Sequence, residues 1–281
     1  MKKIDTPLTV EGKGQKNTQS RRGKSFGYQV LGFGAGGSGA PGIVANGGTL
    51  TYDGDDGINT FTSTGTLEVV QLGKNGDNQV EYVVVAGGGT GTNGGGQGGG
   101  GAGGYRANGT YNMTVAVTSY PVTVGTGGAS SNASGTNSSF NSIAATGGGG
   151  GGGNPGGSGG APSGSGNAGG YSPVEGYNGG PNPGHGPYNA SGGGGGSAGT
   201  GGGGGGYAAG GGGPGTVNDI LGTPYTFAAG GTGESNNPSG WGPIGPSIQT
   251  VYGNGAPSSR GGQPEAADGV VIVRYRSLST P

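Results

Sequence analysis

Short runs of alternating or continuous apolar residues predict β-strands in the first half of the chain and again at its end. The expected strands are Thr49–Asp53, Ile58–Thr62, Thr66–Leu72, Val80–Ala86, Thr114–Thr118, Tyr120–Val124 and Gly269–Tyr275. Val80–Ala86 and Gly269–Tyr275 are the clearest, and the continuous apolar end of Val80–Ala86 indicates burial on both faces. No segment repeats apolar residues with the period of an α-helix. We therefore predict an all-β fold with almost no α-helix.

Two details of these strands make specific predictions. The segment Asp53–Gly57 reads Asp-Gly-Asp-Asp-Gly, which is typical of a hairpin turn between the first two strands. Its three aspartates also faintly resemble a calcium loop, but the terminal glutamate and the further oxygen ligands of such a loop are missing. Pro121 predicts that its strand lies at a sheet edge or begins there, because proline cannot donate a ladder hydrogen bond.

Glycine dominates the chain between the two clearest strands. Of the 84 glycines, 66 lie in residues 87–262, in runs such as Gly147–Gly153 and Gly201–Gly206. Apolar residues make up 27% of the whole chain, against ~45–50% in ordinary globular domains. A net charge of −1 does not fit a highly charged disordered coil, and the glycine runs break the strict third-residue period of collagen. An ordinary side-chain core is therefore excluded here.

Two conformations remain for this stretch. It is either a flexible coil or a set of extended three-per-turn helices, the polyglycine II form, whose bare backbones bond directly to one another. Ring side chains and turn pairs such as Asn154-Pro155 punctuate the runs, which favours ordered packing. The simplest topology pairs the two clearest strands in one small β-sandwich, from which the glycine-rich chain emerges as a long insertion.

The predicted organisation has three parts. They are a basic extended N-terminal arm with an aromatic plug (1–34), a β-sandwich core (35–86 plus 263–277, with strands also from 110–125) and a polyglycine II-like domain (87–262). Seven of the twelve basic residues lie in the first 24 positions, so the arm is either a disordered tail or an anchor that becomes ordered against a larger assembly. The plug is equally compatible with an edge strand of the following domain. The anchor candidates are Arg21, Arg22, Lys24, Phe26, Tyr28, Leu31 and Phe33.

Several functional classes are disfavoured by what the sequence lacks. Without cysteine there is no disulfide or thiolate metal site, and no basic residue lies between Ala107 and Ser259 to bind nucleic acid phosphates. The glycine runs contain G-x-G-x-x-G, but no helix pattern follows to complete a dinucleotide site. His185 is the single histidine and has no sequence neighbour for catalysis. We therefore expect that the chain is not an enzyme and that it binds no cofactor or metal ion. Because no apolar core follows Met1-Lys2-Lys3, we also expect no signal peptide and synthesis in the cytoplasm.

An ordered series of motifs resembles the glycine-rich domain of tailed-bacteriophage virion proteins. The motifs are Val80-Glu-Tyr-Val-Val-Val-Ala-Gly-Gly-Gly89, Gly98-Gly-Gly-Gly-Ala-Gly-Gly-Tyr-Arg106, Tyr120-Pro-Val-Thr-Val-Gly-Thr-Gly-Gly128, Gly135-Thr-Asn-Ser-Ser-Phe140 and Gly269-Val-Val-Ile-Val-Arg-Tyr275. The segment from Arg22 to Phe33 is similar to an attachment segment of some marine phage proteins. The resemblance covers nearly the whole chain. Some members of that family are tail-fibre-tip adhesins whose polyglycine helices form a sandwich, with loops at one end that contact the host receptor. This chain differs from those adhesins in having its own β domain and basic arm, so the resemblance implies a subunit built into the particle.

The resemblance also implies partners. They are other virion proteins at the N-terminal arm and a host-surface saccharide or outer-membrane protein at the loops, and homo-oligomerisation is left open. By analogy, the stretches Tyr171–Tyr188 and Glu234–Trp241 are the expected contact loops. The candidate receptor contacts are Tyr171, Tyr177, His185, Tyr188 and Trp241, although these rings could instead cover the glycine layer.

Three alternatives to an adhesive virion protein remain open. The first is a purely structural tail or head fibre, or a decoration subunit, without receptor binding. The second is a glycine-rich surface or matrix protein of a cellular organism. The third, a glycan depolymerase, is disfavoured because acidic residues are scarce in 107–259.

Overall fold

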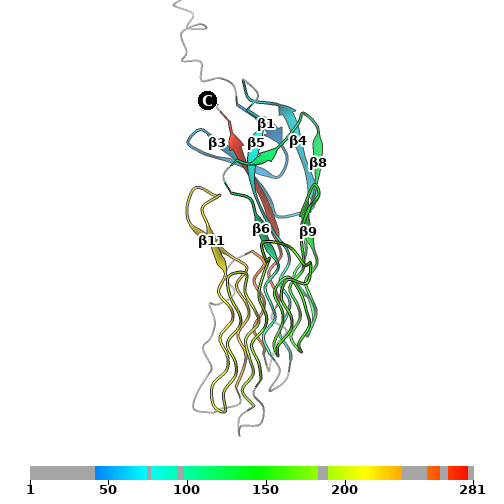
Figure 1. Cartoon of the computed structure of the whole chain (residues 1–281). Helices are drawn as coiled ribbons and strands as arrows, with labels where there is room; N and C mark the ends of the chain where they lie inside the picture. Colours follow the sequence, from blue (N-terminus) through cyan, green and yellow to red (C-terminus); the bar gives the residue numbers. More distant parts are fainter. Residues whose placement is uncertain are drawn as a thin grey trace, which may run out of the picture. The chain divides into compact units, whose positions relative to one another are not determined.

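The computed structural model describes residues 42–74, 77–93, 98–109, 111–182, 189–235, 252–259 and 265–277. These residues belong to one compact unit, Gly42–Pro281. Their regular elements are all β-strands (Figure 1), which confirms the predicted all-β class. Within the described ranges, no helix has the length and apolar character needed to cross a membrane.

Two antiparallel sheets pack face to face in a β-sandwich. The five-stranded sheet has the order β1 (Val44–Asn46), β4 (Gly65–Gln71), β8 (Ser119–Thr123), β9 (Ser138–Phe140) and β10 (Ile143–Ala145). The six-stranded sheet has the order β2 (Thr49–Asp53), β3 (Asp56–Phe61), β13 (Val270–Arg276), β5 (Gln79–Val85) and β6 (Tyr105–Ala107), and β7 (Met113–Thr114) also pairs with β5. A separate hairpin of β11 (Thr216–Asn218) and β12 (Tyr225–Phe227) contributes Phe227 to a cluster on the outer face of the six-stranded sheet.

The two clearest predicted strands are neighbours at the centre of the six-stranded sheet. β5 and β13 pair antiparallel, with Val85 opposite Val270. Alternate residues of β13 point to opposite faces: Val271 and Val273 enter the core between the sheets, whereas Val270 and Ile272 enter the cluster under the β11–β12 hairpin. Their continuous apolar sequence therefore reflects burial on both faces, as predicted.

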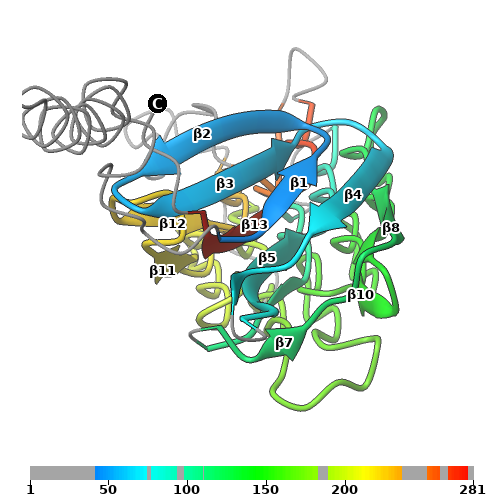
Figure 2. The ribbon, with the colours of Figure 1, turned by 90° about the horizontal axis from the view of Figure 1, so that it is seen from above.

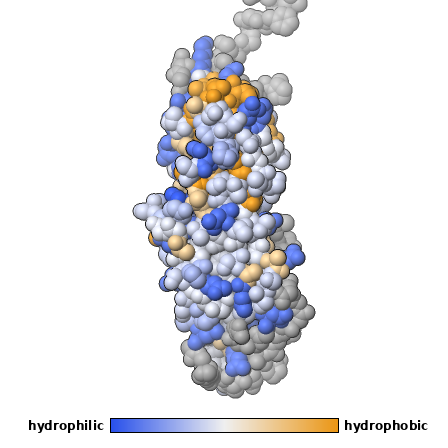
Figure 3. Space-filling view, turned by 90° about the vertical axis from the view of Figure 1, so that its right-hand side faces the viewer, coloured by the Kyte–Doolittle hydropathy of each residue, from blue (hydrophilic) through white to orange (hydrophobic). Residues whose placement is uncertain are grey.

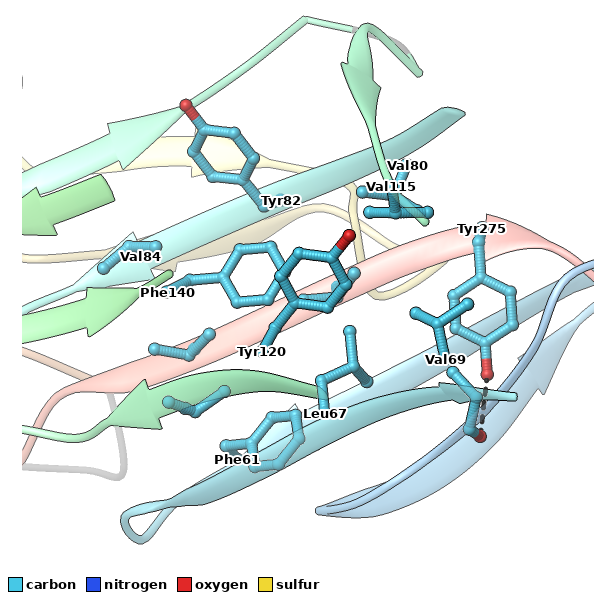
Figure 4. Close-up of a cluster of buried hydrophobic side chains, with 14 of the residues drawn as sticks. Phe61, Leu67, Val69, Val80, Tyr82, Val84, Val115, Tyr120, Phe140 and Tyr275 are labelled. Carbon is cyan, nitrogen blue, oxygen red and sulfur yellow. Dashed lines mark hydrogen bonds between the residues drawn. The ribbon is translucent and has the colours of Figure 1, made fainter. Parts of the chain in front are cut away.

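Aromatic rings fill much of the core between the sheets (Figure 4). The ring of Phe140 on β9 lies 6.2 Å from the ring of Tyr82 and 6.0 Å from the ring of Tyr120, centroid to centroid. The buried hydroxyl of Tyr275 donates a hydrogen bond of 2.7 Å to Oδ1 of Asn59. The aromatic rings of this core thus come from both sheets, whereas the hydrogen-bonded pair of Tyr275 and Asn59 joins two strands of the six-stranded sheet.

The prediction for Pro121 is wrong. This proline lies inside β8, which has β4 on one side and β9 on the other. The carbonyl oxygen of Pro121 accepts a hydrogen bond of 2.9 Å from the N–H of Asn141, just beyond the end of β9. The N and O of one residue point to the same side of an antiparallel strand. The nitrogen of Pro121 therefore points towards Asn141, beyond the end of the β8–β9 ladder. The lack of an N–H at this position costs no hydrogen bond of that ladder.

The glycine-rich segments bond to one another with a period of three residues. Every third amide of segment 86–92 donates to the antiparallel segment 98–104, in the bonds Ala86 to Gly104, Gly89 to Gly101 and Thr92 to Gly98, at 3.0, 2.8 and 3.2 Å. Segment 191–197 repeats the pattern with segment 228–234, in the bonds Ser191 to Glu234, Gly194 to Gly231 and Ser197 to Ala228, at 2.8, 2.8 and 2.9 Å. A helix with three residues per turn presents every third residue to the same neighbour. These segments are therefore polyglycine II-type helices, seen as parallel wavy traces in Figure 1.

The central segment 98–104 is surrounded by other segments on all sides. It exchanges backbone hydrogen bonds with six of them: 86–92, 146–152, 156–161, 191–197, 228–234 and 252–259. Each amide from Gly99 to Gly104 donates to a carbonyl of a neighbouring segment. Six neighbours around one rod is hexagonal packing, and it gives each buried amide from Gly99 to Gly104 a carbonyl partner.

We call the packed array of glycine-rich segments the lattice. Most of its glycine positions leave no room for a side chain. A Cβ on Gly194 would overlap the carbonyl oxygen of Gly100, and a Cβ on Gly212 would overlap the carbonyl oxygen of Gly230. A Cβ on Gly211, next to Gly212 in the same run, would have no neighbouring atom within 4 Å. Neighbouring glycines of one run therefore differ sharply in what they tolerate.

This difference gives a matched test of the lattice. Gly212→Ala should lower the free energy of unfolding by roughly 1–3 kcal/mol, because the segments must move apart. Gly211→Ala should change it by less than about 1 kcal/mol, since its methyl group enters open space and the unfolded chain loses freedom. Urea unfolding followed by circular dichroism measures both. Equal destabilisation by the two variants would contradict the packing.

Arg274 on β13 ties three elements together on the outer face of the six-stranded sheet. Its guanidinium binds Oδ2 of Asp53 at 2.9 Å and Oδ2 of Asp56 at 2.7 Å, and it donates a longer bond of 3.4 Å to the carbonyl oxygen of Asp219. The predicted hairpin turn between β2 and β3 is confirmed, and its Asp53 and Asp56 carboxylates serve this ion pair. In register with Arg274 lies Glu81 of β5, which is 9% exposed.

The environment of Glu81 predicts a pH-dependent stability. Burial raises the pKa of Glu81 above its ordinary value, and this outweighs the attraction of Arg274. A raised folded-state pKa contributes stability at pH values below the unfolded pKa, and that contribution is lost as the pH rises through the folded pKa. Glu81→Gln should therefore raise the melting temperature at pH 7, and the gain should shrink towards pH 4.

Differential scanning calorimetry of the variant across this pH range makes the measurement. Glu68→Gln on β4, where the side chain is exposed, is the control and should shift the melting temperature little. A Glu81→Gln variant that melts below the native protein at pH 7 would show that the Arg274 attraction dominates instead.

Candidate functional site

The glycine-rich segments have one end at the sandwich and one end in loops. Segment 86–92 leaves β5 and segment 98–104 returns antiparallel into β6, so Thr92 and Gly98 lie at the ends of these segments that are away from the sandwich. We call this side the loop end (Figure 1). Its described turns are Asn93, 129–132, 152–155, 162–164, Pro181–Asn182, 189–190, 205–208 and Glu234–Ser235. Hydrogen bonds connect several of these turns, although they lie far apart in the sequence.

Side chains of the loop end fix the turns to one another. The N–H of Asn93 donates to Oγ of Ser131 at 2.8 Å, and Nδ2 of Asn154 donates to the carbonyl oxygen of Asn132 at 3.1 Å. On another part of this end, Oγ of Ser235 donates to the carbonyl oxygen of Tyr207 at 3.0 Å. Short polar side chains thus hold the described turns in defined positions.

The chemistry of the loop end is neutral and polar. Its described side chains are mainly asparagine, serine and proline, and Glu234 is the one charged residue among them. The ring of Tyr207 is 64% exposed, the highest value among the exposed large apolar side chains of the described residues. In the space-filling view of one face (Figure 3), hydrophobic residues gather mainly over the sandwich, and the coloured part of the glycine-rich body is mostly hydrophilic or neutral. Amides, hydroxyls and an exposed ring are suited to contacts with an uncharged polar ligand.

Tyr171 and Tyr177, two of the predicted contact residues, do not lie together at the loop end. The guanidinium of Arg106 on β6 stacks over the ring of Tyr171, 4.0 Å from its centroid, so Tyr171 lies at the sandwich end. Tyr177 is 39% exposed, and its N–H donates to the carbonyl oxygen of Gly196 within the lattice. The described residues 171–182 are thus not one exposed loop: they run from the sandwich end through the lattice to the loop end.

The remaining predicted residues cannot be placed. His185, Tyr188 and Trp241, and the anchor candidates Arg21, Arg22, Lys24, Phe26, Tyr28, Leu31 and Phe33, lie outside the described residues. Their roles stay predictions.

Glu175 is a junction residue that the sequence did not single out. Its side chain is fully buried. Oε2 accepts a hydrogen bond of 2.8 Å from the N–H of Thr146, and Oε1 accepts one of 3.1 Å from the N–H of Gly169. Its carbonyl oxygen accepts another, of 2.9 Å, from the N–H of Tyr105 on β6. The carboxylate joins three chain segments where the lattice meets the sandwich, which is a structural role.

No described part of the chain brings together the acidic, histidine or cysteine side chains that a metal ion would need. The ionisable groups with shifted pKa values are dispersed over the sandwich. Burial raises the pKa of Tyr105 and of Tyr275 to about 12, and both rings pack in hydrophobic clusters.

Comparison with known proteins supports the glycine-rich character of the chain. No curated protein matches the chain. The sequence pattern of the family described as "Glycine-rich domain" matches residues 62–276. The match begins just after β3 and ends with the last residue of β13, so it includes most of the sandwich strands and all the glycine-rich segments. The chain therefore belongs to the glycine-rich domain family.

Proposed function

We propose that this chain is a bacteriophage virion structural protein, anchored by its N-terminal arm to the tail or head, that presents its glycine-rich body for attachment to the host surface. The observation that carries the proposal is the separation of the two ends of the lattice. The sandwich occupies one end, and polar turns from distant parts of the sequence gather at the other. The ordered motifs that resemble phage virion proteins support the same role.

The lattice is suited to holding contact loops in place. Its rods are joined by backbone hydrogen bonds on every side, as segment 98–104 illustrates. The bonds between turns at the loop end add to this order. A preorganised surface loses less conformational entropy on binding than a flexible one. Loop residues can also vary in sequence without disturbing the lattice, because the rods contact each other through backbone atoms.

The composition of the loop end favours a saccharide over an outer-membrane protein as the receptor. Asparagine amides and serine hydroxyls can exchange hydrogen bonds with sugar hydroxyls, and the exposed Tyr207 ring offers an apolar face. In this proposal Tyr207 is the central described contact.

A purely structural fibre or decoration subunit is the second candidate. It is favoured by the internal bonds of the loop end, where groups such as Asn93 N–H, Asn154 Nδ2 and Ser235 Oγ already have partners in the chain. In that case the loops would close the lattice without binding a receptor.

Binding of the fluorescently labelled full chain to host cells separates the two candidates. Tyr207→Ala should weaken binding by about tenfold or more, as expected for an exposed aromatic contact, without lowering the melting temperature. Tyr177→Ala, which changes an exposed ring away from the loop end, should bind like the native chain. Equal binding by both variants would show that Tyr207 does not contact the receptor. Absence of binding by the native chain would favour the structural role.

The anchor has its own test in assembled particles. Deleting residues 1–24 should leave the melting temperature of the purified chain unchanged, because the compact unit begins at Gly42. The truncated chain should be absent from purified particles when it replaces the native one in an infection. Normal incorporation, measured by mass spectrometry of the particles, would refute the anchor.

A further inference from the structure

β2 is an outer strand of the six-stranded sheet with its second edge unpaired in the described residues. It pairs with β3 on one side, and no other described strand follows it in the sheet order. Figure 2 shows β2 at the margin of the sandwich. Its first four residues are exposed, and they include two large side chains, Leu50 at 42% and Tyr52 at 53%.

The hairpin geometry shows which backbone groups face outward. Gly54 and Asp55 form the two-residue turn between β2 and β3, and Gly54 has a φ of +59°. The residues that flank such a turn form a hydrogen-bonded pair, here Asp53 and Asp56. Bonding then alternates along the strand, so the N–H and C=O groups of Leu50 and Tyr52 point away from β3. The described residues offer these groups no backbone partner.

β2 also lacks the usual features that prevent edge pairing. Protected edges carry lysine, proline or a bulge, or are very short. β2 reads Thr-Leu-Thr-Tyr-Asp, its single charge at Asp53 is paired with Arg274, and it pairs with β3 without a register shift. By contrast β1, the outer strand of the five-stranded sheet, has three residues and an irregular register between Val44 and Ala45. The outer strand β1 thus has features that hinder pairing with another strand, whereas β2 does not.

We propose that β2 pairs antiparallel with β2 of a second copy of this chain, with the twofold axis at Thr51. In this register Thr51 lies opposite Thr51 of the partner subunit. Leu50 lies opposite Tyr52 of the partner subunit, and the outward N–H and C=O groups of these two residues form the ladder. The two six-stranded sheets become one continuous sheet.

The side chains of β2 make this pairing self-complementary. An aliphatic side chain meets an aromatic one in each of the two Leu50–Tyr52 pairs, which is a favourable cross-strand combination. Asp53 lies opposite Thr49 of the partner subunit, so no like charges meet. A contact related by a twofold axis requires such a match between one surface and itself.

The pairing also extends the core of the sandwich. Leu50 is opposite Asn59 and Tyr52 is opposite Gly57 on β3. Asn59 binds the Tyr275 hydroxyl, and Gly57 lies against the Tyr275 ring. Leu50 and Tyr52 therefore stand on the sheet face that bears the core between the sheets, and dimerisation would cover them. This inference does not rest on the proposed host attachment or on the proposed N-terminal anchor.

A disulfide tests the register directly, because the chain has no cysteine of its own. Thr51→Cys in the full chain should form an intermolecular disulfide under mild oxidation, since directly opposed residues that are not hydrogen-bonded lie within disulfide reach. Leu50→Cys should not, because it opposes Tyr52 of the partner subunit. Val70→Cys, on an exposed position of β4, is a second control. Equal cross-linking of the three variants would overturn the register.

The mass in solution tests the contact itself. Sedimentation equilibrium should give twice the chain mass for the native protein and the single chain mass for Leu50→Lys. Val70→Lys is matched to it, since both native side chains are 42% exposed, and it should stay dimeric. A native protein that is monomeric throughout the accessible concentration range, or a Leu50→Lys variant with unchanged dimer mass, would overturn the proposal.

Discussion

The hydrogen bond between one glycine backbone and the next is the interaction on which this structure depends. Ordering glycine costs more conformational entropy than ordering any other residue, and segment 98–103 has only the methyl group of Ala102 to bury in return. The absence of side chains lets neighbouring backbones approach closely. Each amide from Gly99 to Gly104 then donates to a carbonyl of another segment, so close packing and bonded polar groups replace a side-chain core.

The lattice and the sandwich need each other. A uniform glycine run has no side chain that could select its neighbour or its register. The strands supply that selection: β5 leads into segment 86–92, β12 leads into segment 228–234, and β6 receives segment 98–104. The buried carboxylate of Glu175 fixes two further segments at the same junction. In turn, residues of the lattice such as Ala102 and Ala228 complete the cluster on the outer face of the six-stranded sheet.

The sequence predicted the parts of the fold that depend on long apolar patterns. β2, β5 and β13 lie within one residue of their expected bounds, and the polyglycine II form was one of two conformations that the glycine runs allowed. Six strands of three residues each were missed: β1, β6 and β9 to β12. Three residues are too few to show an alternating apolar pattern.

Long-range contacts were the other limit on prediction. The position of Tyr171 beside Arg106 and the partners of Glu175 depend on which segments become neighbours. Because the glycine runs are nearly identical, the local sequence does not indicate which segments will become neighbours. The neutral loop end could be anticipated only from composition, and its turns are brought together by the antiparallel course of the rods.

The proposed attachment role assumes that the glycine-rich body is a rigid lattice. Residue-resolved amide hydrogen exchange on the full chain tests this most directly. The account predicts that the amides of Gly99–Gly104 exchange as slowly as those of β5 and β13. Exchange of Gly99–Gly104 at the rate of an unstructured peptide, while β5 and β13 stay protected, would contradict it.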